Sequence, residues 1–215
     1  MKTLQTEDGS FTLYNKEYDQ HYHSKSGAIE EATKKYVDVC ELQNGMTVID
    51  YCFGLGFNSL VALARFDNLY VYALENDAMM LLSLDVDLVP DSYKPLYSQL
   101  LTALHGHLNK NETDFEVVIG TSTIRFLVGD ARETITHVKD GDVCFFDPFS
   151  PVACPHLWTV PVFKQVYAAL KQKGMVATYS YARIVREGFA KAGFTVKDGP
   201  IVGRRSPSTL AYKGL

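Results

Sequence analysis

Four groups with useful chemistry stand directly after apolar runs of the sequence: Gly54, Glu75, Asp130 and Asp147. Such runs predict buried strands, and the ligands of parallel sheets bind beyond the carboxyl ends of the strands. We therefore expect these positions to meet at one site. A glycine turn offers backbone N–H groups to a ligand, and the carboxylates offer acceptors for hydroxyl and amine groups.

The glycine turn has features of a nucleotide-binding loop. Residues 53–58 read Phe-Gly-Leu-Gly-Phe-Asn, and Glu75 follows at the end of the next apolar run, where such folds place the carboxylate that binds ribose hydroxyls. The loop lacks the third glycine that packs around a pyrophosphate, so a cofactor without phosphates, S-adenosylmethionine, fits better. Its zwitterionic end can be held by N–H groups at a helix N-terminus and by the Asn58 amide, without a lysine or arginine clamp. By itself, the glycine pair could equally mark a turn that needs positive φ.

The segment 145–151, Phe-Phe-Asp-Pro-Phe-Ser-Pro, is the second informative site. Asp147 ends a very apolar run, and Pro148 removes an N–H donor so that carbonyl acceptors remain. Phe149 offers a face for a flat ring. An acid and carbonyl oxygens at one point suit a substrate amine, although Asp147 could also serve only as a cap and turn residue.

The elements that must position these groups alternate between strands and helices. Helices are predicted over 28–42, 58–65, 161–170 and 182–192, with a further helix between 90 and 111 that covers one sheet edge; strands are predicted after Gly45 and over 69–75, 116–119, 123–128, 142–146 and 175–180. This order predicts an α/β fold of the Rossmann-like S-adenosylmethionine-dependent methyltransferase class, with a mostly parallel sheet. Segments 194–197 and 209–213 predict an antiparallel edge hairpin. Residues 1–26 are expected to form a small N-terminal β-hairpin extension before a core of residues 27–215, within a single methyltransferase domain.

Composition excludes several classes of protein. At 215 residues, with 47% hydrophobic and 21% charged residues, the chain suits one well-packed domain. No apolar run approaches the roughly 20 residues that cross a bilayer, and residues 1–8 lack a signal-peptide core, so we expect a cytoplasmic protein without a membrane partner. The four cysteines contain no Cys-x-x-Cys pair and are expected to be buried free thiols, and the histidines lack a third ligand at a suitable spacing, so no metal is expected. The oligomeric state stays open, with a monomer favoured.

Charge is unevenly distributed along the chain. Residues 1–155 carry 11 Lys and Arg against 23 Asp and Glu, whereas residues 156–215 carry 10 against 2. A basic C-terminal third can hold a polyanion through phosphate contacts even though the net charge of the chain is −4. The alternative is a solvated, lysine-rich helix face.

Several short motifs follow one another in the order found in one family. Residues 23–31 read His-Ser-x-x-Gly-Ala-x-Glu-Glu, and they are followed by the glycine loop, Glu75, Gly129-Asp130-Ala131, the segment 146–151 with Pro155 and Trp158-Thr159, and the segments 177–182, 185–189, 192–194 and 203–205. Over residues 20–213 the chain resembles the MnmC-type tRNA 5-(aminomethyl)uridine methyltransferase domain, in a stand-alone form without the flavin oxidase domain. One departure is Pro148, where the family usually has glycine.

The resemblance implies S-adenosylmethionine-dependent methylation of the aminomethyl group on the tRNA wobble uridine, in the anticodon region, giving 5-methylaminomethyl-(2-thio)uridine. It implies that Asp147 is the catalytic residue that faces the substrate amine and that Asp130 faces the adenine amine. The expected cofactor-binding residues are Phe53, Gly54, Gly56, Asn58, Glu75, Asp130 and Ala131. Contacts with the uridine and the surrounding tRNA are expected from Pro148, Phe149, Trp158, Tyr179, Tyr181, Arg183, Arg186, Arg204 and Arg205.

Alternatives remain open at this point. Asp147 could accept a proton from the amine or, as we favour, orient the amine and stabilise the charge that appears on it. The aromatic residues could belong to the core instead. A small-molecule amine methyltransferase or an aminopropyltransferase could use the same fold, although the basic C-terminal third argues against a polyamine substrate. A non-catalytic RNA-binding protein with a relic cofactor pocket is the third function considered.

Overall fold

A mostly parallel sheet forms the centre of the structure, a computed structural model that describes residues 2–202 and 206–214. Within these residues the sheet has eight strands in the order β10-β11-β9-β8-β4-β5-β7-β6. They are β4 (Thr47–Tyr51), β5 (Tyr70–Glu75), β6 (Asp114–Ile119), β7 (Ser122–Val128), β8 (Gly141–Phe146), β9 (Leu170–Thr178), β10 (Phe194–Asp198) and β11 (Thr209–Lys213). The central strands from β9 to β7 run parallel, whereas the pairs β6–β7, β9–β11 and β10–β11 are antiparallel. The predicted Rossmann-like fold with an antiparallel edge hairpin is confirmed.

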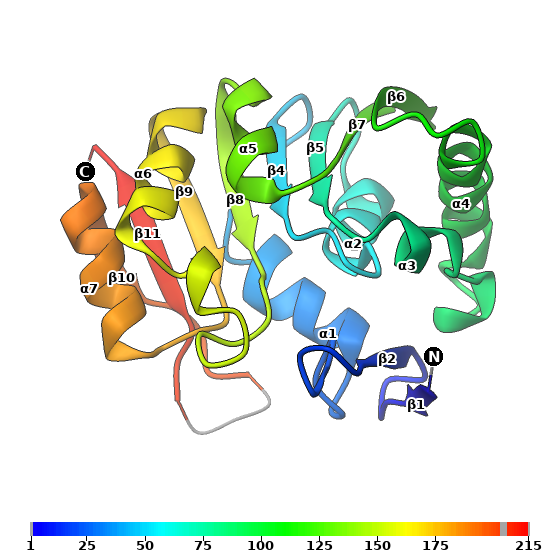
Figure 1. Cartoon of the computed structure of the whole chain (residues 1–215), viewed down its shortest axis with the longest axis horizontal. Helices are drawn as coiled ribbons and strands as arrows, with labels where there is room; N and C mark the ends of the chain where they lie inside the picture. The colour runs from blue at the N-terminus through cyan, green and yellow to red at the C-terminus, as the bar shows by residue number, and fades with distance from the viewer. Residues whose placement is uncertain (1, 203–205, 215) are drawn as a thin grey trace.

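Helices cover both faces of this sheet (Figure 1). They are α2 (Phe57–Arg65), α3 (Ala78–Leu82), α4 (Lys94–Leu108), α5 (Ala131–Thr134), α6 (Val160–Ala169) and α7 (Arg183–Ala192), with short 3-10 turns at Val86–Leu88, Ile135–His137 and Pro155–Leu157. Neighbouring strand residues enter opposite cores: Val48 and Phe145 pack on one face, Ile49 and Phe146 on the other. Burial of both faces explains why the strands read as continuous apolar runs. Among the described residues, no helix has the length and apolar character needed to cross a membrane.

A small antiparallel sheet precedes the core and lies at the same end of the molecule as the loops that follow the parallel strands (Figure 1). It consists of β1 (Lys2–Gln5), β2 (Phe11–Asn15) and β3 (Gln20–His21), in that order. The pattern predicts a hairpin around Asn15, and this hairpin is the β2–β3 pair. Strand β1 was not expected, because its mostly exposed Lys-Thr-Leu-Gln sequence lacks an apolar alternation.

The helix predicted over 28–42 is shorter than expected and changes its winding. Helix α1 covers Ala28–Ala32, and the π-helical turn η1 covers Thr33–Val37, closed by a hydrogen bond of 2.8 Å from the Asp38 N–H to the Thr33 carbonyl. Within this turn the consecutive residues Lys35, Tyr36 and Val37 are all buried. The wider winding of a π turn follows directly on the α-helical turn, and both contribute buried side chains.

Candidate active site

A cavity of about 770 Å³ opens beyond the carboxyl ends of the central strands. Gly54, Glu75, Asp130 and Asp147, which follow or end β4, β5, β7 and β8, all border it. These strands are neighbours in the sheet, and the chain changes from one side of β4 to the other when it returns to form β8. Such a switch point is where open α/β sheets bind ligands. The four groups expected to converge are therefore together at one cavity.

Glu75 ties two loops of the cavity together. Its Oε2 accepts a hydrogen bond of 2.8 Å from the Gly54 N–H, and its Oε1 accepts from the N–H groups of Asn76 at 2.9 Å and Asp77 at 3.1 Å. Burial raises the pKa of this carboxyl group, and the three backbone hydrogen bonds oppose the rise. A carboxylate has about four acceptor positions, so one is left for a ligand hydroxyl.

Two residues expected to bind the cofactor, Phe53 and Gly56, shape the glycine loop. Gly56, with φ of 77°, begins α2 from the left-handed region. A side chain at this position would collide with the ring of Phe53, which is itself buried against Phe126. Neither Gly56 nor Phe53 borders the cavity. Both determine how closely the loop approaches it.

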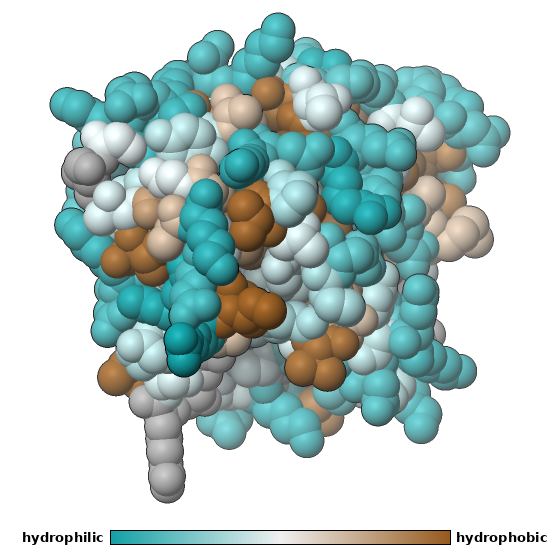
Figure 2. Space-filling model, turned by 60° about the vertical axis from the view of Figure 1, so that its left-hand side comes forward, coloured by the Kyte–Doolittle hydropathy of each residue, from teal (hydrophilic) through white to brown (hydrophobic). Residues whose placement is uncertain are grey.

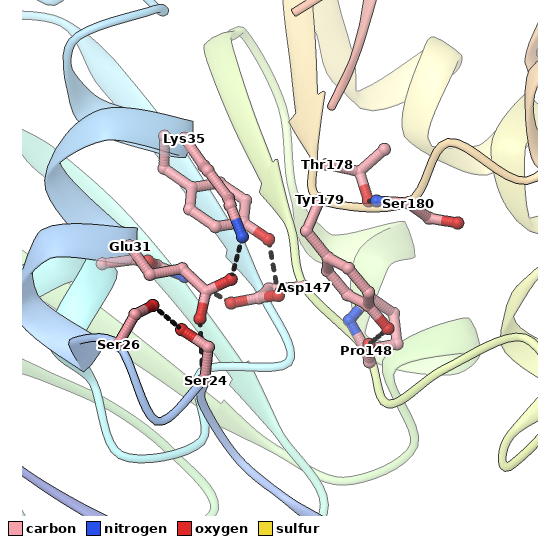
Figure 3. A network of polar contacts seen from close by, with 11 residues as sticks. Ser24, Ser26, Glu31, Lys35, Asp147, Pro148, Thr178, Tyr179 and Ser180 are labelled. Atoms are coloured by element: carbon pink, nitrogen blue, oxygen red, sulfur yellow. Dashed lines mark hydrogen bonds and ion pairs between the residues drawn. The ribbon is translucent and has the colours of Figure 1, made fainter. Parts of the chain in front are cut away.

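Asp147 lies at the cavity with both carboxylate oxygens engaged (Figure 3). Oδ1 accepts a hydrogen bond of 2.5 Å from the Tyr36 hydroxyl, and Oδ2 accepts one of 2.9 Å from Nδ2 of Asn58. Burial, and then the negative charge of Glu31, raise the pKa of Asp147 to about 7, while Tyr36, Asn58 and Lys35 lower it. A carboxyl group with this pKa can accept a proton near neutral pH.

Beside Asp147, the N-terminal helix contributes a buried ion pair (Figure 3). Nζ of Lys35 lies 2.5 Å from Oε1 of Glu31, and their side chains are only 4% and 13% exposed. Oε2 of Glu31 accepts a hydrogen bond of 3.0 Å from the Ser24 N–H. Burial opposes ionisation of Glu31, but the Lys35 ammonium lowers its pKa overall. Both side chains border the cavity.

Sequence reasoning did not identify Lys35 or Tyr36 as site residues. The available signal was a run of two Glu and two Lys at four-residue spacing, which is typical of exposed helix faces. Glu30–Lys34 is such an exposed pair, whereas Glu31–Lys35 is buried. The residue types and their spacing are the same in both pairs and do not predict which pair is buried.

The N-terminal sheet closes one side of the cavity. Tyr18 stacks on Phe149 with ring centroids 4.7 Å apart, and Tyr22 meets the same ring edge-on at 4.9 Å. Gln20 and Ser150 exchange two hydrogen bonds, of 2.6 and 3.1 Å. Phe149 therefore borders the cavity as expected, but Tyr18 covers the face that we expected to be open for a flat ring.

Asp130 has an additional partner that the sequence did not predict. It caps α5 through the Arg132 N–H at 2.9 Å, and its carboxylate also accepts from the Arg132 guanidinium. This hydrogen bond lowers the pKa of Asp130. Asp130 and Ala131 border the cavity, so an adenine amine there would share the carboxylate with Arg132.

The remaining expected aromatic residues divide into two groups. Tyr179 borders the cavity and donates a hydrogen bond of 3.1 Å to the carbonyl of Pro148, which borders it too. Trp158 does not border the cavity: its indole N–H donates to the Phe149 carbonyl at 2.7 Å from a buried position behind the loop. Tyr181 lies outside as well, with the Arg186 guanidinium 4.6 Å above its ring. Trp158 and Tyr181, which we expected to contact the uridine, are therefore not part of the cavity lining.

Two of the basic residues expected to meet tRNA, Arg183 and Arg186, lie on α7. Arg183 pairs with Glu187 at 2.6 Å, and Arg186 pairs with Asp198 at 2.8 Å, so both guanidinium charges have acidic neighbours. Arg204 and Arg205 lie outside the described residues. Figure 2 turns the side that carries α6 and α7 forward and shows it as largely hydrophilic, with apolar residues in small separate groups.

One observation beside the cavity fits S-adenosylmethionine. Asn58 does not itself border the cavity but donates to Asp147, which does; it is 3% exposed, and its Oδ1 finds no hydrogen-bond partner among the described residues. A buried acceptor without a partner calls for a donor, which the amino group of the cofactor would supply. Within residues 2–202 and 206–214, no cluster of His, Cys, Asp and Glu could hold a metal ion. Cys52, expected to be buried, is partly exposed at the cavity.

Comparisons of sequence identify a family and relatives for this chain. Residues 91–214 match the family of S-adenosyl-L-methionine-dependent methyltransferases. The uncharacterized protein MJ0670 of Methanocaldococcus jannaschii is 30% identical over 98% of this chain and 59% of its own length. The tRNA 5-methylaminomethyl-2-thiouridine biosynthesis bifunctional protein MnmC of Polaromonas naphthalenivorans is 29% identical over 90% of this chain and 33% of its own length. This chain thus spans less than two thirds of either relative.

Solved structures share the fold. MNMC2 from Aquifex aeolicus has a TM-score of 0.77 and 28% identity, over 98% of this chain and 69% of that one. A spermidine synthase in complex with the transition state analogue AdoDATO has a TM-score of 0.57 and 13% identity, over 100% of this chain and 73% of that one. At this identity, the similarity to the spermidine synthase shows a shared fold and no more.

Proposed function

This chain belongs to the S-adenosyl-L-methionine-dependent methyltransferases, and from that premise we propose that it methylates the aminomethyl group of the tRNA wobble uridine. The product would be 5-methylaminomethyl-(2-thio)uridine. The observation that carries the proposal is Asp147, an acid held at the cavity by Tyr36 and Asn58 and placed to meet a substrate amine. Likeness to MnmC over 90% of the chain supports the choice of amine. The chain spans 33% of that relative, and the proposal covers the methyl transfer alone.

The chain's own residues supply the conditions for transfer. When bound, S-adenosylmethionine provides an electrophilic methyl group on its sulfonium. An alkylamine has a pKa near that of lysine, about 10, so it arrives protonated and must lose a proton before it attacks. Asp147 holds this ammonium, and burial lowers the pKa of the amine while it raises the pKa of Asp147 to about 7. Burial brings the two pKa values closer, and we therefore assign proton acceptance to Asp147 in addition to the orienting role favoured from the sequence.

The protein surface on the C-terminal side would hold the tRNA backbone. Residues 156–215 carry 10 Lys and Arg against 2 Asp and Glu, which supports phosphate contacts. We assign these contacts to Arg183, Arg186, Arg204 and Arg205. Replacing Arg204 and Arg205 by glutamate should weaken tRNA binding and reduce its dependence on salt. An unchanged salt dependence would exclude this surface.

The proposed reaction is tested with S-adenosylmethionine that carries a labelled methyl group. The purified protein is incubated with tRNA that contains 5-aminomethyluridine, with unmodified transcript as the control, and the product is digested to nucleosides. Label in 5-methylaminomethyluridine from the modified tRNA alone supports the proposal. If the protein binds the cofactor but labels neither RNA, the tRNA substrate is wrong, and small amines become the substrates to examine.

A further inference from the structure

Lys35 is a buried cation at the cavity with few partners. Its side chain is 4% exposed and borders the cavity next to Asp147. An ammonium group has three N–H donors, and Oε1 of Glu31 is the one hydrogen-bond acceptor that Lys35 has among the described residues. A buried charge is stable only when it is paired and hydrogen-bonded. The remaining donors of Lys35 therefore call for an acceptor from a ligand.

The ion pair with Glu31 does not explain the burial of Lys35. Lys34 and Glu30 have the same residue types at the same spacing, yet their side chains are 52% and 36% exposed. In η1, Lys35 turns inward together with Tyr36, whose hydroxyl holds Asp147. The turn thus places a cation beside the acid proposed to receive the substrate amine.

We propose that Lys35 binds the carboxylate of the amino-acid end of S-adenosylmethionine and makes the site specific for a cofactor that has this carboxylate. Asn58, whose Oδ1 has no partner within the described part of the chain, would accept from the amino group of the same end. Asn58 donates to Asp147 at 2.9 Å, and the Lys35 charge lowers the pKa of Asp147, so both groups act at one place. This proposal differs from the expectation that backbone N–H groups and Asn58 hold this end of the cofactor without a lysine.

The burial of Lys35 favours a carboxylate of the cofactor over a phosphate of tRNA as its ligand. A tRNA phosphate belongs to a solvated backbone, and a side chain that is 4% exposed is closed to it. A carboxylate on a small molecule enclosed in the cavity can reach the same ammonium. The inference depends on the cofactor of the proposed function and not on tRNA as the substrate.

The test compares two ligands and two forms of the protein in the absence of tRNA. Calorimetry measures the Kd of S-adenosylmethionine and of decarboxylated S-adenosylmethionine, for the wild type and for Lys35→Met. A charged hydrogen bond is worth about 10- to 100-fold in affinity, so the wild type should prefer the carboxylated ligand by about that factor. Lys35→Met should bind both ligands with nearly equal affinity.

Matched variants keep the result interpretable. Lys34→Met removes a neighbouring lysine of the exposed pair and should retain the full preference. If Lys35→Met fails to fold because Glu31 is left unpaired, the double variant Glu31→Gln/Lys35→Met removes both charges and should also lack the preference. The proposal is overturned if the Lys35 variant that folds keeps the wild-type preference, or if the wild type binds both ligands equally. Since no tRNA is present, either outcome leaves the test of methyl transfer to tRNA separate.

Discussion

The hydroxyl of Tyr36 lies 2.5 Å from Oδ1 of Asp147, and so joins a π-helical turn to the end of a strand 111 residues later. On the other side, Asn58 holds Oδ2 from the first turn of α2. The acid is therefore fixed by two segments that are remote from it in the sequence. This arrangement orients the carboxylate toward the cavity and makes its protonation sensitive to the surroundings.

Asp147→Asn should separate methyl transfer from cofactor binding. The variant keeps the size of the side chain but can neither accept a proton nor balance an ammonium charge. We expect turnover to fall by about 100-fold or more, as for loss of an acid–base group. The Kd of S-adenosylmethionine should change by less than a few-fold. Steady-state rates and calorimetry measure the two effects, and exposed Asp140→Asn is the control.

An equal loss of cofactor affinity in Asp147→Asn would move this residue into the cofactor site. Normal turnover would exclude it from the chemistry.

The pH dependence of kcat/KM should report the ionisation of Asp147. Because its pKa is about 7, the carboxylate form is lost as the pH falls below that value. We expect kcat/KM to rise about tenfold per pH unit below pH 7 and to level off above it. In Asp147→Asn the residual activity should lack this rise. The measurement should extend from pH 5.5 to pH 8, limits that lie about one unit or more on either side of this pKa. A wild-type profile that is flat over this range would contradict the role of Asp147 as proton acceptor.

The same pKa predicts how stability depends on pH. Below pH 3.8, the usual pKa of aspartate, Asp147 is protonated in both the folded and the unfolded chain. It then contributes nothing to the pH dependence of the free energy of unfolding. Between that value and about 7, the unfolded chain has released the proton and the folded chain has not, so this group makes the free energy of unfolding fall as the pH rises. Urea denaturation at several pH values should show a smaller fall in Asp147→Asn than in the wild type.

Glu75→Gln should weaken cofactor binding and loosen the glycine loop together. The carboxylate accepts from three backbone N–H groups, and an amide would present a donor to one of them. We expect the Kd of S-adenosylmethionine to rise by about 10- to 100-fold, with a lower melting temperature. Glu133→Gln, on the exposed side of α5, should change neither quantity. Unaltered affinity would place the ribose acceptor elsewhere.

Gly56→Ala should destabilise the fold because the new methyl group meets the Phe53 ring at a backbone φ of 77°. The strained backbone and the collision should lower the free energy of unfolding by about 1–3 kcal/mol. Gly106 lies within α4, and a methyl group there would contact nothing, so Gly106→Ala should raise stability by about 0.5–1 kcal/mol. Urea denaturation measures the change in the free energy of unfolding for both variants. Changes of opposite sign for the same Gly-to-Ala substitution would separate the effect of local geometry from that of helix propensity.

Gln20→Ala should loosen the N-terminal sheet from the loop that carries Phe149. Two hydrogen bonds to Ser150, of 2.6 and 3.1 Å, are lost, which should reduce stability by about 1–2 kcal/mol. If the contact between the N-terminal sheet and the Phe149 loop positions the uridine, the KM for tRNA should rise more than the KM for the cofactor. Gln99→Ala, exposed on α4, is the control. Equal effects on both KM values would indicate that this contact encloses the cofactor and does not position the uridine.

The sequence by itself determined the order of the elements and the groups at the strand ends. Apolar runs and glycine turns are local signals, and they placed Gly54, Glu75, Asp130 and Asp147 after successive strands. Since the carboxyl ends of parallel strands meet at one edge, convergence at one cavity followed from topology without any knowledge of side-chain contacts.

Only the tertiary structure decided which other side chains complete the site. Lys34 and Lys35 belong to ion pairs of the same residue types and spacing, and only the packed structure shows that one is exposed and the other buried. Likewise Tyr18 covers Phe149, and Trp158 supports the loop from behind, because segments remote in the sequence pack there. These contacts depend on long-range packing, which residue types and their spacing do not specify.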